Sequence, residues 1–360
     1  MASEKIALAT LFTGIGAAEF AAHEVFAEYD MAFACEIDKF ARQSYLVNHA
    51  IDEKHFHRDI KELDAKAYAS KVDILIGGSP CQDFSLAGLR AGIDGTRGEL
   101  IYEFIRIVDE CHPKVFIYEN VKGFLSINHG KSYQRFLEAL RNLGYHCYAD
   151  VVNTKDYGIP QNRERIYIVG FLNSELYHAF EFAPKELLKL NLGDMLDREV
   201  DEKYLISAEL KRYLLDERSP YRGCFRLKTG QDIANTINIK EGQRRENNYI
   251  RVIGKLDIKG KEQIKRVYDT TGLAPTIHTA QGGNQESKIL NDGFKIRKLT
   301  PRECLRLQGF PESFKIVCSD TQTYKQAGNA MSVNVVAMIL RQIQKIKEGV
   351  SDSLFAKAAV

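Results

Sequence analysis

Short apolar runs alternate with segments of helical spacing through the first 170 residues, and this alternation is the strongest constraint on the fold. Runs such as 6–12, 72–80 and 114–121 have the length of buried strands. Amphipathic stretches lie between them, as at 98–112 and 133–144. This pattern predicts an α/β fold with a doubly wound, mostly parallel sheet. Ligands of such sheets bind beyond the carboxyl ends of the strands, so the residues that follow each run are candidates for function.

The pattern changes near residue 185. Residues 186–295 are polar and irregular, with turn signals such as KTGQD, KEGQ and QGGNQ, which indicates a second, smaller domain of short strands and loops. We expect residues 1–185 and 296–348 to form the main domain and residues 349–360 to form a C-terminal tail.

Local signals place helix ends and a closing helix. Thr300, followed by Pro301 and Glu303, predicts a helix that begins with a capping box. Gly144 ends the helical segment before it and suits a left-handed cap. The amphipathic segment 332–346 predicts a helix that returns to the main domain.

Charge is unevenly distributed along the chain, although the net charge of the whole sequence is only +2. Residues 222–302 contain 17 Lys and Arg against 8 Asp and Glu, a net charge of +9 that leaves −7 for the rest. A basic segment on an acidic body indicates a polyanionic partner. A solvated, lysine-rich surface explains the same charge equally well.

Composition excludes several classes of protein. Apolar residues make up 44% and charged residues 27%, as in an ordinary soluble globular protein. The first residues contain no long apolar run, so the sequence predicts neither a signal peptide nor a membrane-spanning helix. The seven cysteines lack paired spacing, which argues against a disulfide framework or a zinc site and favours a reducing cytoplasm.

Glycines and acidic residues follow the first strands of the predicted sheet. The turn FTGIGA at 12–17 lets a ligand approach the backbone at a helix N-terminus, although a lone Gly-x-Gly also makes an ordinary tight turn. Glu36 ends the second strand, where an acidic residue can bond a ribose. Asp59 precedes the third strand and is placed to face an adenine amino group. Together these residues indicate an adenosyl-binding site.

One cysteine follows the end of a strand. Cys81 lies in the segment GSPCQDFS at 78–85, and the glycine-rich residues 88–98 come after it. A lone cysteine is usually an inert, buried residue. A thiol at the ligand-binding edge of a parallel sheet, before a loop whose glycines permit motion, favours a reactive thiolate.

Charged residues mark the ends of two later strands. Glu119 and Asn120 end the fourth strand, where Glu119 can stay protonated or share a proton with a base beside Cys81. Arg163 and Arg165 are two residues apart and therefore share one face of a strand, toward an anion or a carbonyl. Taken alone, the acid also fits a helix cap or a surface group, and the arginines fit an exposed charge run better than a binding site.

In their order and spacing, these motifs resemble those of the DNA (cytosine-5) methyltransferases, over residues 6 to about 345. The matching segments are Phe12-x-Gly14-x-Gly16, Pro80-Cys81-Gln82, Glu119-Asn120-Val121, Gln161-x-Arg163-x-Arg165, Arg297 to Pro311 and Gln326 to Val335. The layout is similar to that of compact bacterial restriction-modification enzymes. The resemblance implies an S-adenosylmethionine-dependent methyltransferase fold, with a target-recognition domain at 186–295.

The resemblance also implies a reaction on a cytosine that is flipped out of duplex DNA. Cys81 attacks carbon 6 of the base, and Glu119 favours protonation of nitrogen 3, so that carbon 5 takes the methyl group of S-adenosylmethionine. Arg165 contacts the base carbonyl, Arg163 orders the pocket and Asn120 orients the turn before Cys81.

For the cofactor, the resemblance implies contacts along the edge of the sheet, and no metal is expected. The implied contacts are Phe12, Gly14, Ile15, Gly16, Glu36, Ile37, Asp59, Ile60, Pro80, Leu100 and Asn329. Members of the family often have Trp where this chain has Ile37, so the packing on adenine should be aliphatic and weaker. The resemblance also places Gln82 in the catalytic group.

Double-stranded DNA is the partner that the resemblance implies, with arginine and lysine on phosphates and amide side chains on base edges. The DNA-contacting candidates are Ser85, Arg97, Arg244, Arg245, Thr276, Gln281, Asn284 and Gln285. The resemblance implies a monomer on DNA in a prokaryotic cytoplasm, with a companion restriction endonuclease as a family-level expectation.

Other classes fit the sequence less well. Transfer-RNA cytosine methyltransferases carry a Pro-Cys-Gln-Pro-Phe-Thr loop and a Cys-Phe-Thr tripeptide, and neither occurs here. Amino-directed DNA methyltransferases have an acidic or polar residue before Pro-Pro-aromatic, and other RNA cytosine-5 enzymes use a Thr-Cys pair; this chain has Pro80-Cys81. A catalytically dead DNA-binding homologue is disfavoured because every expected catalytic residue is present.

Overall fold

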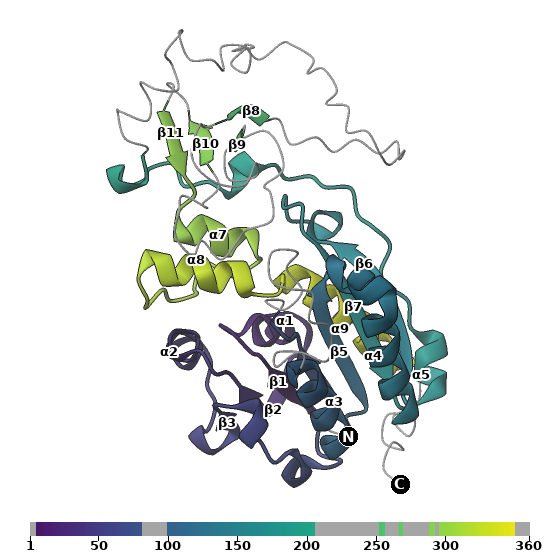
Figure 1. Cartoon of the computed structure of the whole chain (residues 1–360). Coiled ribbons are helices and arrows are strands. Elements are labelled where there is room, and N and C mark those ends of the chain that lie inside the picture. The colour runs from purple at the N-terminus through teal and green to yellow at the C-terminus, as the bar shows by residue number, and fades with distance from the viewer. Residues whose placement is uncertain are drawn as a thin grey trace.

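The computed structural model describes residues 5–80, 99–205, 252–255, 266–268, 288–291 and 295–349 of the chain (Figure 1). The side chains of 252–296 are not part of this description. Four of the predicted site residues in the first half of the chain, Cys81, Gln82, Ser85 and Arg97, lie outside the described residues.

A seven-stranded sheet forms the main body, with the strand order β3-β2-β1-β4-β5-β7-β6. Its strands are β1 (Ile6–Leu11), β2 (Tyr29–Cys35), β3 (Phe56–His57), β4 (Ile74–Gly77), β5 (Val115–Val121), β6 (His146–Asn153) and β7 (Glu164–Phe171). Among these strands, β7 runs in the opposite direction to the other six, so its pairings with β5 and β6 are antiparallel. The predicted α/β fold with a mostly parallel sheet is therefore confirmed.

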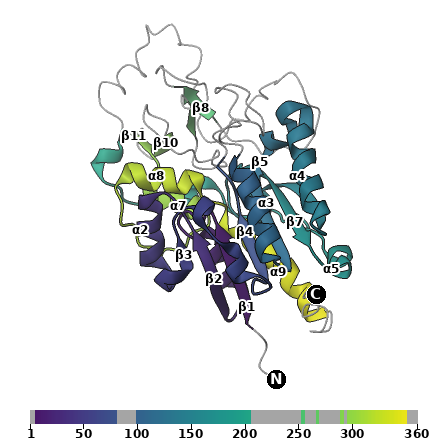
Figure 2. The same cartoon turned by 60° about the horizontal axis from the view of Figure 1, so that its bottom comes forward.

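Helices cover both faces of this sheet (Figures 1 and 2). Helices α1 (Ala17–Val25) and α9 (Val333–Gly349) share one core with Val115 and Ile117. Helices α3 (Glu99–Cys111) and α4 (Lys131–Asn142) share the other core with Phe116 and Tyr118. The split follows from the alternation of side chains along a strand. The same alternation sends Glu119 and Asn120 to opposite faces of the sheet at the end of β5.

A second, four-stranded sheet has the order β11-β10-β9-β8. Its strands are β8 (Val252–Lys255), β9 (Arg266–Tyr268), β10 (Lys288–Asn291) and β11 (Lys295–Lys298). Both views place it beside α7 (Pro301–Leu307) and α8 (Asp320–Asn329). The prediction of short strands between residues 186 and 295 is confirmed for β8 to β10, while the domain boundaries themselves stay a prediction.

Several local signals in the sequence are confirmed. Thr300 and Glu303 form the reciprocal capping box at the start of α7, with Pro301 in the first turn. Gly144 adopts φ 90° just after α4, in the left-handed region that favours glycine. Helix α9 packs against α1 and so returns to the main body.

Other elements were not predicted. The missed ones are β3, α8 and the short helix α5 (Ser174–Ala179). The sequence predicts a helix from Lys39 to about Asn48, and α2 (Lys39–Asn48) lies there. The apolar segment at 32–38 predicts a second strand, but β2 begins and ends three residues earlier, because Tyr29 already pairs with β1. Within the described ranges, no helix is long and apolar enough to cross a membrane.

Candidate active site

The carboxyl ends of β1, β2, β4 and β5 meet at one edge of the parallel part of the sheet. Each strand delivers a predicted site segment there: residues 12–16 after β1, Glu36 after β2, residues 78–80 after β4 and Glu119 at the end of β5. The structure thus brings together candidates that are more than 100 residues apart in the sequence. Cys81 is the next residue of the chain after Pro80, outside the described residues.

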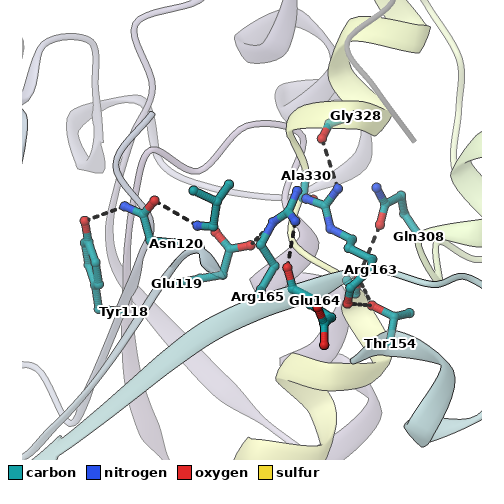
Figure 3. Close-up of polar contacts among 12 residues, drawn as sticks. Tyr118, Glu119, Asn120, Thr154, Arg163, Glu164, Arg165, Gln308, Gly328 and Ala330 are labelled. Atoms are coloured by element: carbon teal, nitrogen blue, oxygen red, sulfur yellow. Dashed lines mark hydrogen bonds and ion pairs between the residues drawn. The ribbon is translucent and has the colours of Figure 1, made fainter. Parts of the chain in front are cut away.

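Glu119 and Arg165 form an ion pair at this edge (Figure 3). The antiparallel register pairs Val121 with Arg165 and Glu119 with Tyr167, so Glu119 and Arg165 are diagonal neighbours on one face. Nε of Arg165 lies 3.3 Å from Oε1 of Glu119. That oxygen is buried and has no aligned hydrogen bond within the described residues. The carboxyl group is therefore held by charge while retaining capacity for a hydrogen bond.

Gly78 lets the β4 strand end lie directly against Glu119. A Cβ atom at this position would stand 2.8 Å from the backbone oxygen of Glu119 and 3.1 Å from its carboxylate. A side chain there would force the two strand ends apart. Glycine is thus required by the close approach of the segment before Cys81 to the candidate acid.

Arg163 is buried and binds backbone carbonyls at the C-terminal end of α8 (Figure 3). Its guanidinium donates to the carbonyl oxygens of Gly328 at 3.3 Å and Ala330 at 2.8 Å. Burial, together with the charge of Arg165, lowers the pKa of Arg163 to about 9, so it stays charged at neutral pH. The sequence predicted an anion or carbonyl partner for this arginine, and carbonyls are what it contacts. It fixes α8, and with it Asn329, next to the site edge.

Asn120 lies on the opposite face of β5, in a neutral, buried hydrogen-bond network. Its Nδ2 donates to the Tyr118 hydroxyl at 2.9 Å and to Oγ of Ser79 at 3.4 Å. The two hydroxyls are 2.6 Å apart. The Asn120 amide oxygen accepts from the Val121 amide at 2.8 Å, which fixes the orientation of the side chain. The network joins the end of β5 to the segment that leads to Cys81.

The loop after β1 has the backbone of a ligand-binding turn. Phe12, Gly14 and Gly16 have φ of 51°, 61° and 86°, and the value at Phe12 is unusual for a residue with a side chain. A Cβ at Gly16 would overlap the His49 ring, which bonds the Ile15 carbonyl at 3.3 Å. The loop therefore requires glycine and presents its backbone at the start of α1.

Glu36 links this loop to β2. Its carboxylate accepts the Gly14 amide at 2.7 Å and the Asp38 amide at 2.8 Å. Burial raises the pKa of Glu36, although these two hydrogen bonds act in the opposite direction. Each carboxylate oxygen has two acceptor sites, so the group can still accept from a ribose hydroxyl. The neighbouring Ile37 is 68% exposed and offers an apolar surface at the same edge.

The other cofactor candidates surround this edge. Phe12 and Leu100 are partly buried against the same core cluster. Asp59 accepts the Lys61 amide at 3.0 Å and caps a short turn in which Ile60 is buried. Pro80 and Asn329 are exposed at the ends of β4 and α8.

The DNA-contacting candidates cannot be placed, because all eight lie outside the described residues. Those in the second half of the chain are Arg244, Arg245, Thr276, Gln281, Asn284 and Gln285. Within the described ranges, no group of three or more His, Cys, Asp and Glu side chains lies close enough to hold a metal ion.

Two polar contacts of the site were not predicted. One is the Tyr118 hydroxyl, which in the sequence is one aromatic residue in an apolar strand. The other joins α8 to α2, where Lys325 pairs with Asp38 at 2.6 Å beside Glu36. Asp38 caps α2 through bonds to neighbouring amides, whereas its partner Lys325 is 287 residues away and could not be found from local sequence.

Two solved structures of other proteins have a similar fold. The methyltransferase EhMeth of Entamoeba histolytica superposes with a TM-score of 0.69 at 16% identity, covering 95% of this chain and 99% of that one. Dnmt2 of S. pombe superposes with a TM-score of 0.66 at 20% identity, covering 95% and 99%. At these identities the likeness concerns the fold alone.

Sequence relatives define the class more narrowly. Residues 6–345 match the family described as "C-5 cytosine-specific DNA methylase". The chain is 36% identical over 342 residues to the Type II methyltransferase M.NlaX of Neisseria lactamica, covering 95% of this chain and 97% of that protein. It is 35% identical over 337 residues to M.HhaI of Haemophilus parahaemolyticus, covering 92% of each. The chain belongs to the C-5 cytosine-specific DNA methylase family, and it is a DNA (cytosine-5) methyltransferase that uses S-adenosylmethionine.

Proposed function

We propose that this enzyme methylates carbon 5 of a flipped-out cytosine within a specific double-stranded DNA sequence, as the modification enzyme of a restriction-modification system. The Glu119–Arg165 pair carries the proposal, since it lies against the strand end that leads to Cys81. The names of the Type II relatives support the restriction-modification role. Flipping is required because the reactive ring of a stacked cytosine is hidden within the duplex.

Cys81 is the nucleophile in this proposal. Its thiolate adds to carbon 6 of the cytosine and forms a sulfur–carbon bond. Glu119 donates a proton to nitrogen 3 as negative charge accumulates on the ring. Its carboxylate oxygen without a hydrogen bond is available for this contact. Carbon 5 thereby becomes nucleophilic and takes the methyl group, whose bond to the donor sulfur breaks to leave S-adenosylhomocysteine as the second product. Water then removes the carbon-5 proton, the electron pair of that bond expels the Cys81 thiolate, and the proton at nitrogen 3 returns to Glu119.

The remaining catalytic candidates hold the base and the turn before Cys81. Arg165 pairs with Glu119 and is placed to donate to the base carbonyl. Arg163 acts from behind by ordering the end of α8. Asn120 orients the turn through its bond to Ser79. Gln82, next to the nucleophile, completes the group.

The edge residues fit S-adenosylmethionine. Glycine backbone at 14 and 16, the Glu36 carboxylate and the exposed Ile37 offer the surfaces that a methionine group, a ribose and an adenine need. Asp59 and Ile60 lie after the neighbouring β3, on the adenine side. When bound there, the cofactor supplies an electrophilic methyl group.

DNA recognition is assigned to residues 186–295, whose net positive charge suits phosphate contacts, with Thr276 and Gln281 among the candidate contacts. Residues 1–185 and 296–348 form the catalytic and cofactor-binding domain in this proposal. The enzyme acts as a monomer on DNA in a prokaryotic cytoplasm and does not contact a companion endonuclease.

Bisulfite sequencing of plasmid DNA from cells that express the protein tests the proposal and also identifies the target sequence. We expect one short motif to be methylated, and Cys81→Ser to abolish transfer while donor binding persists. Cys147→Ser is the matched control, since Cys147 lies on the far edge strand β6, where burial raises its pKa to about 11. In duplexes with 5-fluorocytosine at the target, the trapped adduct should map to Cys81.

Two results would contradict the proposal. Protein that binds the donor but methylates no DNA would overturn the activity and the restriction-modification role together. Near-normal turnover of Cys81→Ser, or an adduct on another cysteine, would remove Cys81 from its role.

A further inference from the structure

We propose that Tyr118 is a positioning residue for methyl transfer, because its hydroxyl fixes the strand end that carries Cys81 relative to the strand end that carries Glu119. This inference rests on the proposed role of Cys81 as nucleophile. It concerns a residue at the end of the apolar run of β5, directly before Glu119, to which the sequence assigned no role.

The backbone pairing of β4 with β5 ends before Ser79, so a side-chain contact is needed to hold this residue against β5. The register runs from Ile74–Val115 to Gly77–Tyr118, and the described pairing ends there. Ser79 therefore lies beyond the ladder, two residues before Cys81. Its hydroxyl is 2.6 Å from the Tyr118 hydroxyl, a short contact within the usual range for two hydroxyls. This bond ties the turn to β5 after the backbone ladder has ended.

The Tyr118 ring is held firmly enough to serve as a fixed point. It is fully buried, and its centroid lies 4.8 Å from that of Phe104 on α3 and 4.6 Å from that of Phe136 on α4. Asn120, itself locked by the Val121 amide, donates to the same hydroxyl at 2.9 Å. The hydroxyl position is thus set by two helices and by its own strand.

The network is neutral and lies on the far side of β5 from Glu119. It cannot contact a base on the Glu119 face, so its effect passes through the backbone of residues 118–120 and of residues 79–80, which directly precede Cys81. A phenylalanine at this position could make the same ring contacts. Of the Tyr118 side chain, only the hydroxyl bonds to Ser79. Misplacing a reacting group by about 1 Å can cost on the order of 100-fold in rate.

Tyr118→Phe is the direct test, because it removes one oxygen atom and keeps the ring. We expect the single-turnover rate at saturating DNA and donor to fall by roughly 10- to 100-fold, with KM for DNA and donor affinity within about twofold of the parent. Tyr145→Phe is the matched control. Tyr145 is buried in the same core, and its hydroxyl makes a 2.7 Å bond to the Pro113 carbonyl at the other end of β5. Its variant should lose stability but keep the parental rate.

A double-mutant cycle with Ser79→Ala separates positioning from general destabilisation. If Tyr118 acts through Ser79, the double variant should be no slower than the slower single variant. The inference is overturned if Tyr118→Phe keeps a rate within twofold of the parent, or if Tyr145→Phe is slowed as much as Tyr118→Phe. It is also overturned if the rate losses of Tyr118→Phe and Ser79→Ala add in the double variant. Should Tyr118→Phe fail to fold, Ser79→Ala alone must reproduce the slowing, and a parental rate would overturn the inference.

The outcome is separable from that of the proposed function. A parent enzyme that transfers no methyl group, or transfers it without Cys81, contradicts the proposed function. A parent that needs Cys81 but is indifferent to the Tyr118 hydroxyl contradicts this inference alone.

Discussion

The ion pair at the candidate active site and the ion pair at the junction with the second sheet are built in opposite ways. Glu303, at the start of α7, is fully buried and accepts hydrogen bonds from the two terminal nitrogens of Arg297 at 2.7 and 2.8 Å. It also accepts the backbone amides of Asp197 at 2.8 Å and Thr300 at 2.7 Å. Four donors thus fill the four acceptor sites of one carboxylate. The Glu303 carboxylate thus joins the segment at Asp197 and the start of α7 to β11, the last strand of the second sheet.

The Glu119–Arg165 pair is looser. Its side chains are 13% and 16% exposed, one contact of 3.3 Å joins them, and the buried carboxylate oxygen has no aligned hydrogen bond within the described residues. A carboxylate that is already saturated cannot serve a substrate without losing a bond, whereas an unsaturated one can. The comparison therefore separates a pair that holds the structure together from a pair that is available for chemistry.

The largest expected effect breaks the pair at the active site. Glu119→Gln keeps the shape of the side chain but cannot deliver a proton, so we expect single-turnover transfer to fall by about 100- to 10,000-fold. Unfolding free energy should change by less than about 1 kcal/mol, because one long contact at a partly exposed site contributes little. Rates measured with labelled donor and denaturation curves check the two parts.

Glu164→Gln is the control for that variant, since Glu164 is an exposed carboxylate next to Arg165 and pairs with Lys122 instead. A Glu119→Gln enzyme with a rate close to that of Glu164→Gln would remove Glu119 from the chemistry. The pair would then be structural in spite of its loose geometry.

The second expected effect breaks the junction pair. Glu303→Gln leaves the Arg297 charge buried without a counter-charge, so we expect unfolding free energy to fall by about 3 kcal/mol or more. Donor affinity of the folded fraction should be unchanged. In Arg297→Met with Glu303→Leu, both charges are gone and much of the stability should return. A loss below about 1 kcal/mol in Glu303→Gln would contradict the structural assignment of the pair.

Much of this comparison could be predicted from the sequence, because the signals are local. The capping box at Thr300 and Glu303, the glycine turn at 14–16 and the polar residues at strand ends depend on a few neighbouring residues. The order of motifs then identified the family. The direction of each strand was harder to predict. The short apolar pattern of β7 fits either orientation, and its antiparallel pairing with β5 brings Arg165 beside Glu119.

The partners of long-range contacts could not be predicted. The carbonyls that Arg163 binds lie 165 and 167 residues further along the chain, at the end of a helix whose sequence DTQTYKQAGN lacks a clear apolar stripe. The second role of Glu303, as partner of Arg297, needed the strand and the helix to be placed first. The Tyr118 hydroxyl is likewise defined only by the position of Ser79.

The smallest expected effect extends the comparison to an exposed pair on the same two elements. Lys122 follows β5, Glu164 begins β7, and their contact of 2.9 Å is shorter than that of the active-site pair next to it. Their side chains are 54% and 47% exposed, so water and salt screen the attraction. We expect Lys122→Ala to change unfolding free energy by less than about 1 kcal/mol in denaturant titrations at low and high salt. A loss of unfolding free energy as large as that predicted for Glu303→Gln would show that a short distance matters more than burial. The distinction between the Glu303–Arg297 pair and the Glu119–Arg165 pair would then fail.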